Sequence, residues 1–539
     1  MASLHVLWFK RDLRIRDHLP LLLAAKSGTV LPIYVFEPSV WSSPEYDASH
    51  FEFVRQSLVE LDLNLRRLGG RLAIRIGELP DVFVHISGAT PIHSIASYEE
   101  TGTWVTYERD KRIARWTQTQ GISWKEIPQN GVVRRLKNRD GWAASWARRM
   151  SEQQTESPER IVVPEDFEWG SIPTIDQVIP KASPVPRGLQ RGGESTASEV
   201  LESFLADRGS DYRSSMSSPL TAESSCSRLS PYLTWGNLSV KQVQQATARR
   251  LGELTCDFGN ADDFERKSRI RSLKSFLSRL SWHCHFIQKL ESEPEIEFRN
   301  ICRLYDGLRE YEFNSERFEA WKKGETGFPM IDACMRYLHH HRWINFRMRA
   351  MLMSFAAYHL WLHWREPSIF LARQFLDFEP GIHFSQCQMQ SGVTGINTIR
   401  IYSPSKQLLD QDPTGEFVRR WVPELEHVPL GFLAEPHRMS IDDQMRYRCR
   451  IGIDYPRPIV DDKTAVKYAK ERIYAIRQTD EAKVAAAEVF LKHGSRKRQF
   501  RDPLPGSPTG KPASVRKAAV KRRKDSNDKQ PRLPGMEDI

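Results

Sequence analysis

Small polar side chains crowd together near the middle of the chain, directly before a predicted helix start. The stretch "SSCSRLSPYLTWGNLS" covers residues 224–239, and its proline and apolar run fit the first turns of a helix. Such a start needs one small polar residue as its N-cap, whose oxygen accepts hydrogen bonds from free backbone N–H groups. Four hydroxyls and one thiol are available: Ser224, Ser225, Cys226, Ser227 and Ser230. The surplus predicts that these side chains hold something other than the helix.

Aromatic and basic side chains are dense in the second half of the chain. Its tryptophans include Trp235, Trp282, Trp321, Trp343, Trp361, Trp364 and Trp421. At helical spacing such residues fit a buried core, and as a group they also suit a planar aromatic cofactor or stacked bases. The same stretch holds four arginines, which need acids or phosphates as partners: Arg336, Arg342, Arg347 and Arg349. Asp377 and Glu379, in "FLDFEPGIHF", are candidate partners, and ordinary helix-to-loop ion pairing explains the set equally well.

Two kinds of predicted secondary structure divide the chain. Apolar runs rich in β-branched and aromatic residues predict strands at 5–10, 29–37, 71–77, 93–100 and 123–128, with helical patterns between them. This alternation predicts an α/β domain with a doubly wound parallel sheet over residues 1–130. No G-x-G-x-x-G follows the first strand, so a dinucleotide site there is not supported. An irregular linker is predicted over 131–200, and a larger all-α domain over 201–493.

Composition limits the class of protein. With 539 residues, 40% hydrophobic and 27% charged, the chain is typical of soluble globular proteins of two or more domains. The start is charged by residue 10, unlike a signal peptide, and the most apolar stretch, 350–362, is too short to span a membrane and predicts a buried core helix. Seven cysteines without a CxxC indicate a reduced compartment and no compact zinc site, although a scattered four-cysteine cluster stays open. We therefore expect no membrane partner and a cytoplasmic location, or a nuclear one in a eukaryote.

The C-terminal segment differs sharply from the rest. Residues 494–539 hold thirteen Lys/Arg against five Asp/Glu, so about +8 of the net charge of +11 lies there. Because the segment is rich in Pro, Gly and Ser and poor in large apolar residues, it is predicted to be a disordered basic tail. Such a tail favours polyanions through counterion release, and a solubilising role is the alternative.

Motifs along the chain carry a family resemblance. "FKRDLRIRD", "SRLSPYLTWG", "WKKGETGFPMIDACMRYL", "RWINFRMR", "WRE", "LDFE", "IRIYSP" and "GEFVRRWVPELEHVP" occur in this order. Their order and spacing up to about residue 435 resemble the DNA photolyase/cryptochrome family. The resemblance implies an antenna-type α/β domain packed on a helical domain that binds FAD, with a second chromophore of folate or deazaflavin type as a further cofactor. It also implies that the polar stretch lies against the flavin diphosphate, where hydroxyls and N–H groups at a helix start suit an anion. The residues concerned are Tyr212, Cys226, Ser227, Arg228, Leu229 and Ser230, with Cys226 replacing the usual threonine.

Other positions acquire roles from the same resemblance. Arg349 and Asp377 match the ion pair beside the isoalloxazine, and Glu379 matches the second acid of that loop. Trp282 matches the tryptophan that stacks on a lesion. Arg279 stands where enzymes acting on cyclobutane dimers have a glutamate, so it is expected to donate to a carbonyl edge or phosphate, to pair with an acid such as Glu379, or to face solvent.

Three further matches concern the flavin ring and its electron supply. His383 falls near the position that faces flavin N5, and Phe346 stands where many members have an amide or a histidine. Trp364 matches the middle tryptophan of the family's electron-transfer triad, and Tyr311 stands at the outermost position. The segment that should hold the innermost tryptophan, 383–400, contains none. Tyr402, Trp361 or Tyr358 could offer a detour.

The resemblance implies a blue-light-driven FAD flavoprotein, and repair of UV-induced pyrimidine dimers in DNA is the leading expectation. Reduced, excited FAD would pass an electron to a flipped dimer and recover it after bond cleavage. The expected partner is damaged DNA, double- or single-stranded, and the expected state is a monomer. The alternatives are a cryptochrome-like photoreceptor that signals through its tail, and a flavin oxidoreductase that works in the dark.

Overall fold

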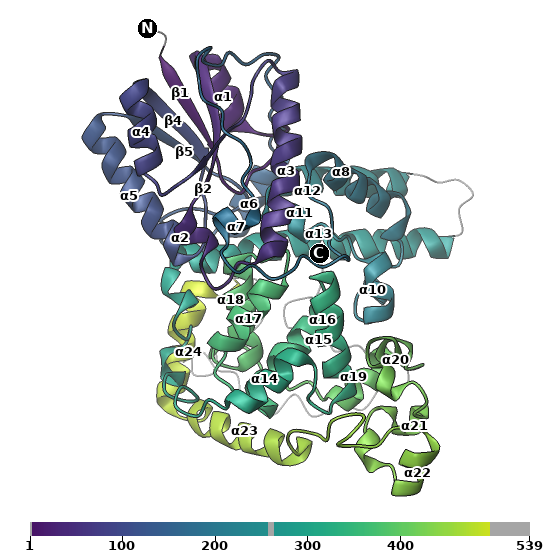
Figure 1. The fold of residues 1–539 in the computed structure, drawn as a ribbon. Helices are drawn as coiled ribbons and strands as arrows, with labels where there is room; N and C mark the ends of the chain where they lie inside the picture. The colour runs from purple at the N-terminus through teal and green to yellow at the C-terminus, as the bar shows by residue number, and fades with distance from the viewer. Residues whose placement is uncertain (1–2, 257–262, 496–539) are drawn as a thin grey trace.

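The computed structural model describes residues 3–256 and 263–495, and it begins with a parallel sheet (Figure 1). The strands are β1 (Leu4–Phe9), β2 (Thr29–Phe36), β3 (Ala73–Ile76), β4 (Ile92–Tyr98) and β5 (Ser123–Ile127). Their order is β3-β2-β1-β4-β5, and every pairing is parallel. The five predicted strands and the doubly wound class are therefore confirmed.

Helices cover both faces of the sheet, because alternate strand residues point to opposite sides. They are α1 (Leu19–Ser27), α2 (Pro38–Trp41), α3 (Ala48–Arg67), α4 (Asp81–Ala89) and α5 (Trp104–Gln120). Leu7 and Phe9 of β1 join the core beneath α1 and α3, whereas Val6 and Trp8 join a second core beneath α4 and α5. Both faces are thus apolar, as the near-continuous hydrophobic strands require.

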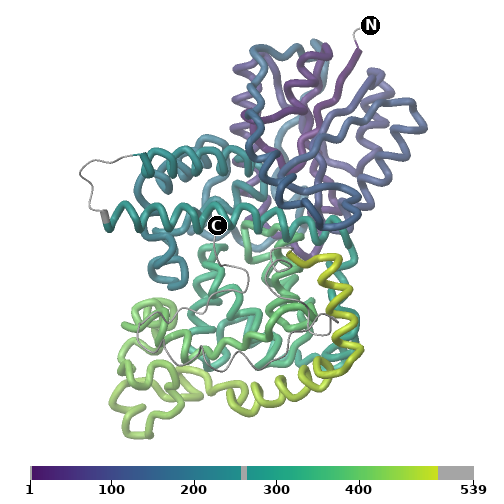
Figure 2. The backbone as a smooth tube through the Cα atoms, turned by 180° about the vertical axis from the view of Figure 1, so that it is seen from behind, coloured from purple at the N-terminus to yellow at the C-terminus, as the bar shows by residue number. Residues whose placement is uncertain are grey.

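The linker region and the helical domain follow. Two helices interrupt the segment after the sheet: α6 (Trp142–Ser151) and α7 (Ile175–Val178). The helical domain contains α8 (Glu194–Ser203), α9 (Tyr212–Ser215), α10 (Pro219–Ser225), α11 (Ser230–Thr234), α12 (Val240–Cys256), α13 (Asp263–Ser292), α14 (Ser315–Lys323), α15 (Pro329–His341), α16 (Phe346–Ser354), α17 (Arg365–Gln374), α18 (Pro380–Ser391), α19 (Pro404–Gln411), α20 (Glu416–Trp421), α21 (Leu430–Leu433), α22 (Ile441–Arg446), α23 (Asp462–Arg477) and α24 (Asp480–His493). Figure 2 shows the long helix α13 crossing between the α/β domain and the later helices of the chain, drawn in green. The predicted domain boundaries remain predictions.

The most apolar stretch of the chain lies in the centre of the helical domain. Residues 350–362 run through α16 and a π-helical turn, Phe355–His359, and all of them are buried. The predicted buried core helix is therefore confirmed, with a π turn as its continuation. Within the described ranges, no helix combines the length and the apolar character needed to cross a membrane. The tail predicted over 494–539 lies, from residue 496 onward, outside the described residues.

Candidate functional site

The polar stretch includes the end of α10, the connection at residues 226–229 and the start of α11. Leu229 occupies the N-cap position of α11, and within residues 3–256 and 263–495 no side-chain hydrogen bond caps that helix. The Ser227 hydroxyl accepts a bond from the Leu229 N–H at 3.4 Å, one position before the helix. The prediction of a small polar N-cap is therefore wrong, because the apolar Leu229 takes that place and is buried. The side chains of residues 225–228 and of Ser230 are half-buried, so this polar surface stays partly accessible.

Arg208 holds this connection in place, and no sequence motif pointed to it. Its guanidinium donates to the carbonyl oxygens of Ser224 at 3.1 Å, Cys226 at 2.7 Å and Ser227 at 3.3 Å. It also bonds the Val200 carbonyl oxygen at 3.1 Å. One side chain thereby ties the polar stretch to α8.

Arg349 and Asp377 form a two-bond ion pair beside the polar stretch. Arg349 donates to the two Asp377 carboxylate oxygens at 2.9 and 3.0 Å. The Ser230 hydroxyl also bonds this carboxylate. Burial alone would raise the pKa of Asp377, but the charge and hydrogen bonds of Arg349 hold it below its ordinary value. Asp377 is therefore a carboxylate, and the pair presents a fixed dipole.

Cys226 lies near arginines of both the polar stretch and the Arg349–Asp377 pair. Burial raises the pKa of its thiol to about 12, against the opposing charges of Arg228, Arg208 and Arg349. The thiol is thus neutral, and it lies within the field of Arg349 from the ion pair. The Arg228 guanidinium lies 4.0 Å from the centre of the Trp343 ring, and its backbone has a φ of +59°.

Glu379 faces the α/β domain rather than Arg349. Its carboxylate lies 3.5 Å from the Arg11 guanidinium, which follows β1. Burial raises the pKa of Glu379 to about 7, although the charge of Arg11 opposes this. Asp377 and Glu379, two residues apart, are therefore paired with arginines from different domains.

Tyr212 and Arg279 lie next to each other. Burial raises the pKa of Tyr212 to about 12, and the charge and hydrogen bond of Arg279 oppose the rise. Arg279 is half-buried, so its side chain lies partly against Tyr212 and partly in solvent, and its role remains a prediction. Three residues further along α13, the half-buried Trp282 ring lies edge to face with His285 at 5.1 Å.

His383 is a neutral, buried side chain of α18. Its Nε2 donates to the Ser368 carbonyl oxygen at 2.8 Å, and the Cys387 Sγ lies 3.7 Å from the same nitrogen. Burial lowers the pKa of His383 to about 4, and Arg349 lowers it further while Asp377 raises it. Phe346, at the start of α16, keeps 45% of its surface exposed, which is unusual for a phenylalanine beside an apolar core.

Trp364 and Tyr311 occupy very different surroundings. Trp364 is fully buried, and its indole N–H donates to Asn300 Oδ1 at 2.8 Å. Tyr311 is 90% exposed. Of the detour candidates, Trp361 is buried, with the Arg309 guanidinium 4.4 Å from its ring centre. Because a cation over an aromatic ring disfavours a second positive charge on that ring, Trp361 is poorly suited to become a radical cation.

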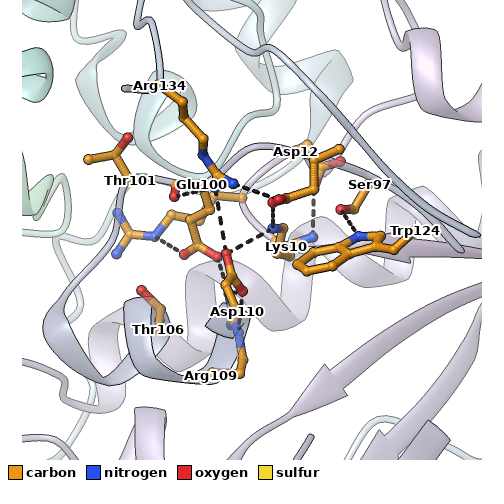
Figure 3. A network of polar contacts seen from close by, with 12 residues as sticks. Lys10, Asp12, Ser97, Glu100, Thr101, Thr106, Arg109, Asp110, Trp124 and Arg134 are labelled. Atoms are coloured by element: carbon orange, nitrogen blue, oxygen red, sulfur yellow. Dashed lines mark hydrogen bonds and ion pairs between the residues drawn. The ribbon is translucent and has the colours of Figure 1, made fainter. Parts of the chain in front are cut away.

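A buried ion network fills the carboxyl ends of β1 and β4 (Figure 3). Arg109 pairs with Glu100 at 2.6 Å and with Asp110 at 2.8 Å, and Lys10 lies 3.6 Å from Asp110. Arg134 extends the network on its outer side. A cavity of about 30 Å³ remains beside it, with Arg11 and Glu379 in its wall, which is room for about two water molecules.

Comparisons with known proteins give these features a family. Residues 5–144 match the family model described as DNA photolyase, and residues 276–475 match the model described as the FAD binding domain of DNA photolyase. A deoxyribodipyrimidine photo-lyase from Alkalihalophilus pseudofirmus is 26% identical over 495 residues, covering 87% of this chain and 97% of its own length. A cryptochrome DASH from Natronomonas pharaonis is 26% identical over 491 residues, covering 85% and 98%.

A solved structure shows the same architecture. The archaeal photolyase from Sulfolobus tokodaii, crystallised with two FAD molecules, has a TM-score of 0.69 and 25% identity, and the match covers 88% of this chain and all of that one. In that protein a novel light-harvesting cofactor is implied. The chain studied here belongs to the DNA photolyase/cryptochrome family, with an α/β domain followed by the helical FAD-binding domain.

Proposed function

We propose that this protein is a blue-light-driven, FAD-dependent DNA photolyase, a carbon–carbon lyase that repairs UV-induced pyrimidine dimers. The observation that carries the proposal is the Arg349–Asp377 pair beside a half-buried polar helix start, inside a domain of the photolyase FAD-binding family. Relatives named deoxyribodipyrimidine photo-lyase support the same reaction for this chain.

The donor set of the site fits a flavin dinucleotide. Backbone N–H groups and the Ser227 and Ser230 hydroxyls at the start of α11 suit a diphosphate. The Arg349–Asp377 pair suits the polar edge of an isoalloxazine, and the exposed Phe346 suits contact with a flat apolar ring. When bound and reduced, FAD supplies the light-driven electron transfer that cleaves a dimer.

The chain's own groups have four tasks in this proposal. Arg349 and Asp377 orient the flavin ring and hold a fixed charge pair at its edge. His383 stays neutral, because its low pKa keeps it unprotonated at physiological pH, and it adds no charge near the ring. Trp282 offers a half-buried ring on which a flipped base can stack, and Arg279 offers N–H donors to base carbonyls or a phosphate.

A second candidate function is supported by the residues predicted to carry electrons to the flavin. Residues 383–400, where the innermost tryptophan of the route is expected, contain no tryptophan. Photoreduction along the family's usual tryptophan route is therefore interrupted, which favours a cryptochrome-like photoreceptor without repair activity. Damaged DNA as partner, a monomeric state and a cytoplasmic or nuclear location belong to the first proposal. A second chromophore of folate or deazaflavin type is compatible with both.

Chromatography of irradiated oligonucleotides separates the two functions. Chemically reduced, FAD-loaded protein is mixed with oligonucleotides that carry one thymine cyclobutane dimer or one (6-4) product, then illuminated or kept dark. Light-dependent recovery of intact thymines from either lesion is expected, with a strong loss in Trp282→Ala. Trp104→Ala, an exposed tryptophan of α5, serves as the matched control. Absence of repair of both lesions by flavin-loaded protein contradicts the photolyase proposal and favours the photoreceptor.

A further inference from the structure

Arg11 lies where the α/β domain meets the loop that carries Asp377. It follows β1, and only 9% of its surface is exposed. Its Nη2 donates to the Tyr46 hydroxyl at 2.7 Å, and its Nη1 lies 3.4 Å from the Phe378 carbonyl oxygen and 3.5 Å from Glu379 Oε2. Because a guanidinium presents its donors in a rigid fork, this single side chain connects both domains.

The backbone around Arg11 is packed against the end of α11. The Leu13 N–H donates to the Trp235 carbonyl oxygen at 3.2 Å. Gly236 has a φ of +74°, and a Cβ on it would lie only 2.3 Å from the Arg11 carbonyl oxygen, so the close approach requires glycine. The Trp235 ring lies under the Arg11 guanidinium at 5.0 Å.

These contacts fix the backbone on both sides of Asp377. On one side, the Trp235 indole N–H donates to the Leu376 carbonyl oxygen at 3.1 Å. On the other side, Arg11 binds the Phe378 carbonyl oxygen. With both neighbouring carbonyl groups held, the direction of the Asp377 side chain toward Arg349 is set from outside its own loop.

Arg11 lies at the edge of the ion network. Its Nε lies 3.8 Å from Glu100 Oε1, and Glu100 is bonded to Arg109 at 2.6 Å. Arg109 pairs with Glu37, Glu100 and Asp110, all within the α/β domain. The network therefore has one buried arginine that reaches the Asp377 loop and a second buried arginine, Arg109, whose ion pairs stay in its own domain.

We propose that Arg11 is a positioning residue for the flavin site: from the α/β domain it holds the loop at Phe378 and Glu379, and so keeps Asp377 in its two-bond pair with Arg349. This inference rests on the proposed flavin site and extends it to the other domain. The α/β domain then acts on flavin binding through a structural contact, independently of any second chromophore.

The test compares two conservative arginine replacements in FAD-loaded protein. The rate of FAD release is followed by the fluorescence of free flavin, and the melting temperature is measured in parallel. Arg11→Lys keeps the charge but loses the fork, and it is expected to release FAD on the order of tenfold faster. Arg109→Lys should lower the melting temperature and leave the release rate within about twofold of wild type. If Arg11→Lys does not fold, Tyr46→Phe is the milder replacement, and it should also release FAD faster than wild type.

Coupling to Asp377 separates positioning from general damage. If Arg11 acts through Asp377, the double variant Arg11→Lys/Asp377→Asn should release FAD no faster than the faster single variant. The inference would be overturned if Arg11→Lys released FAD at the wild-type rate, or if the two substitutions multiplied the release rate independently in the double variant. Either result would leave the flavin site intact. Wild-type release in Asp377→Asn alone contradicts the flavin site itself, and the role of Arg11 with it.

Discussion

Replacing Arg208 by lysine should weaken FAD binding without touching any predicted flavin contact. The Arg208 guanidinium makes hydrogen bonds to four carbonyl oxygens and to the Ser203 hydroxyl. Three of those carbonyls belong to the polar stretch, at Ser224, Cys226 and Ser227. A lysine has one nitrogen with three donors, so it cannot span the same carbonyl groups.

The magnitude follows from the number of bonds lost. A lysine at position 208 can keep about two of the five bonds, and each lost bond contributes about 0.5–1.5 kcal/mol net, toward the lower end because the side chain is half-exposed. The free energy that favours the ordered form of the polar stretch over its unordered form is then smaller by about 2 kcal/mol. If FAD binds only the ordered form, its affinity falls by a factor of about 30.

Equilibrium titration of flavin-free protein with FAD measures this effect. Arg213→Lys, an exposed arginine five positions along the chain, is the matched control and should bind like wild type. Far-ultraviolet circular dichroism confirms that both variants are folded. Unchanged FAD affinity in folded Arg208→Lys protein would refute the reasoning that this connection must be ordered to hold the cofactor.

Three further predictions concern pH, lesion contact and the tail. Burial raises the pKa of Glu297 from its ordinary 4.5 to about 7, so the stability that its proton supports is lost as pH rises from about 4.5 through 7. Glu297→Gln removes this titration, while its amide oxygen can still accept the Trp104 N–H. In urea unfolding, the loss in free energy of unfolding from pH 5 to pH 8 should be smaller for Glu297→Gln than for wild type, by up to about 3 kcal/mol. Equal losses in the two proteins contradict this prediction. Arg279→Ala should cost lesion affinity on the order of 1–3 kcal/mol and leave binding of undamaged DNA nearly unchanged, as measured by fluorescence anisotropy. Equal or better lesion binding with altered flavin photochemistry would instead identify Arg279 as a plug of the pocket. Removal of residues 494–539 should lower non-specific DNA affinity and flatten its salt dependence while lesion repair survives, and an unchanged salt slope would reduce the tail to a solubilising segment.

Local patterns sufficed to predict the sheet and the buried centre of the helical domain. The strands were predictable because each is a short apolar run, and both faces of the sheet are buried. Residues 350–362 were predictable as core because they contain no Asp, Glu, Lys or Arg. The Arg349–Asp377 contact followed from the family resemblance, since 28 positions separate the two residues.

Contacts between distant or unremarkable residues escaped prediction. Arg11 and Glu379 are 368 positions apart and meet only because two domains pack together. Arg208 has no motif around it, since its partners are backbone carbonyls that any sequence supplies. The predicted small polar cap of α11 was wrong for a related reason: the chain places Leu229 at the N-cap and leaves the hydroxyls accessible. Such accessible hydroxyls are what a bound phosphate needs.

The flavin content of purified protein tests the central claim most directly. Protein prepared gently in the dark should be yellow and should release FAD, close to one per chain, on denaturation. Asp377→Asn should retain much less, because its Arg349 partner loses a charged acceptor while the fold persists. Colourless, flavin-free wild-type protein that also fails to take up added FAD would contradict the account as a whole.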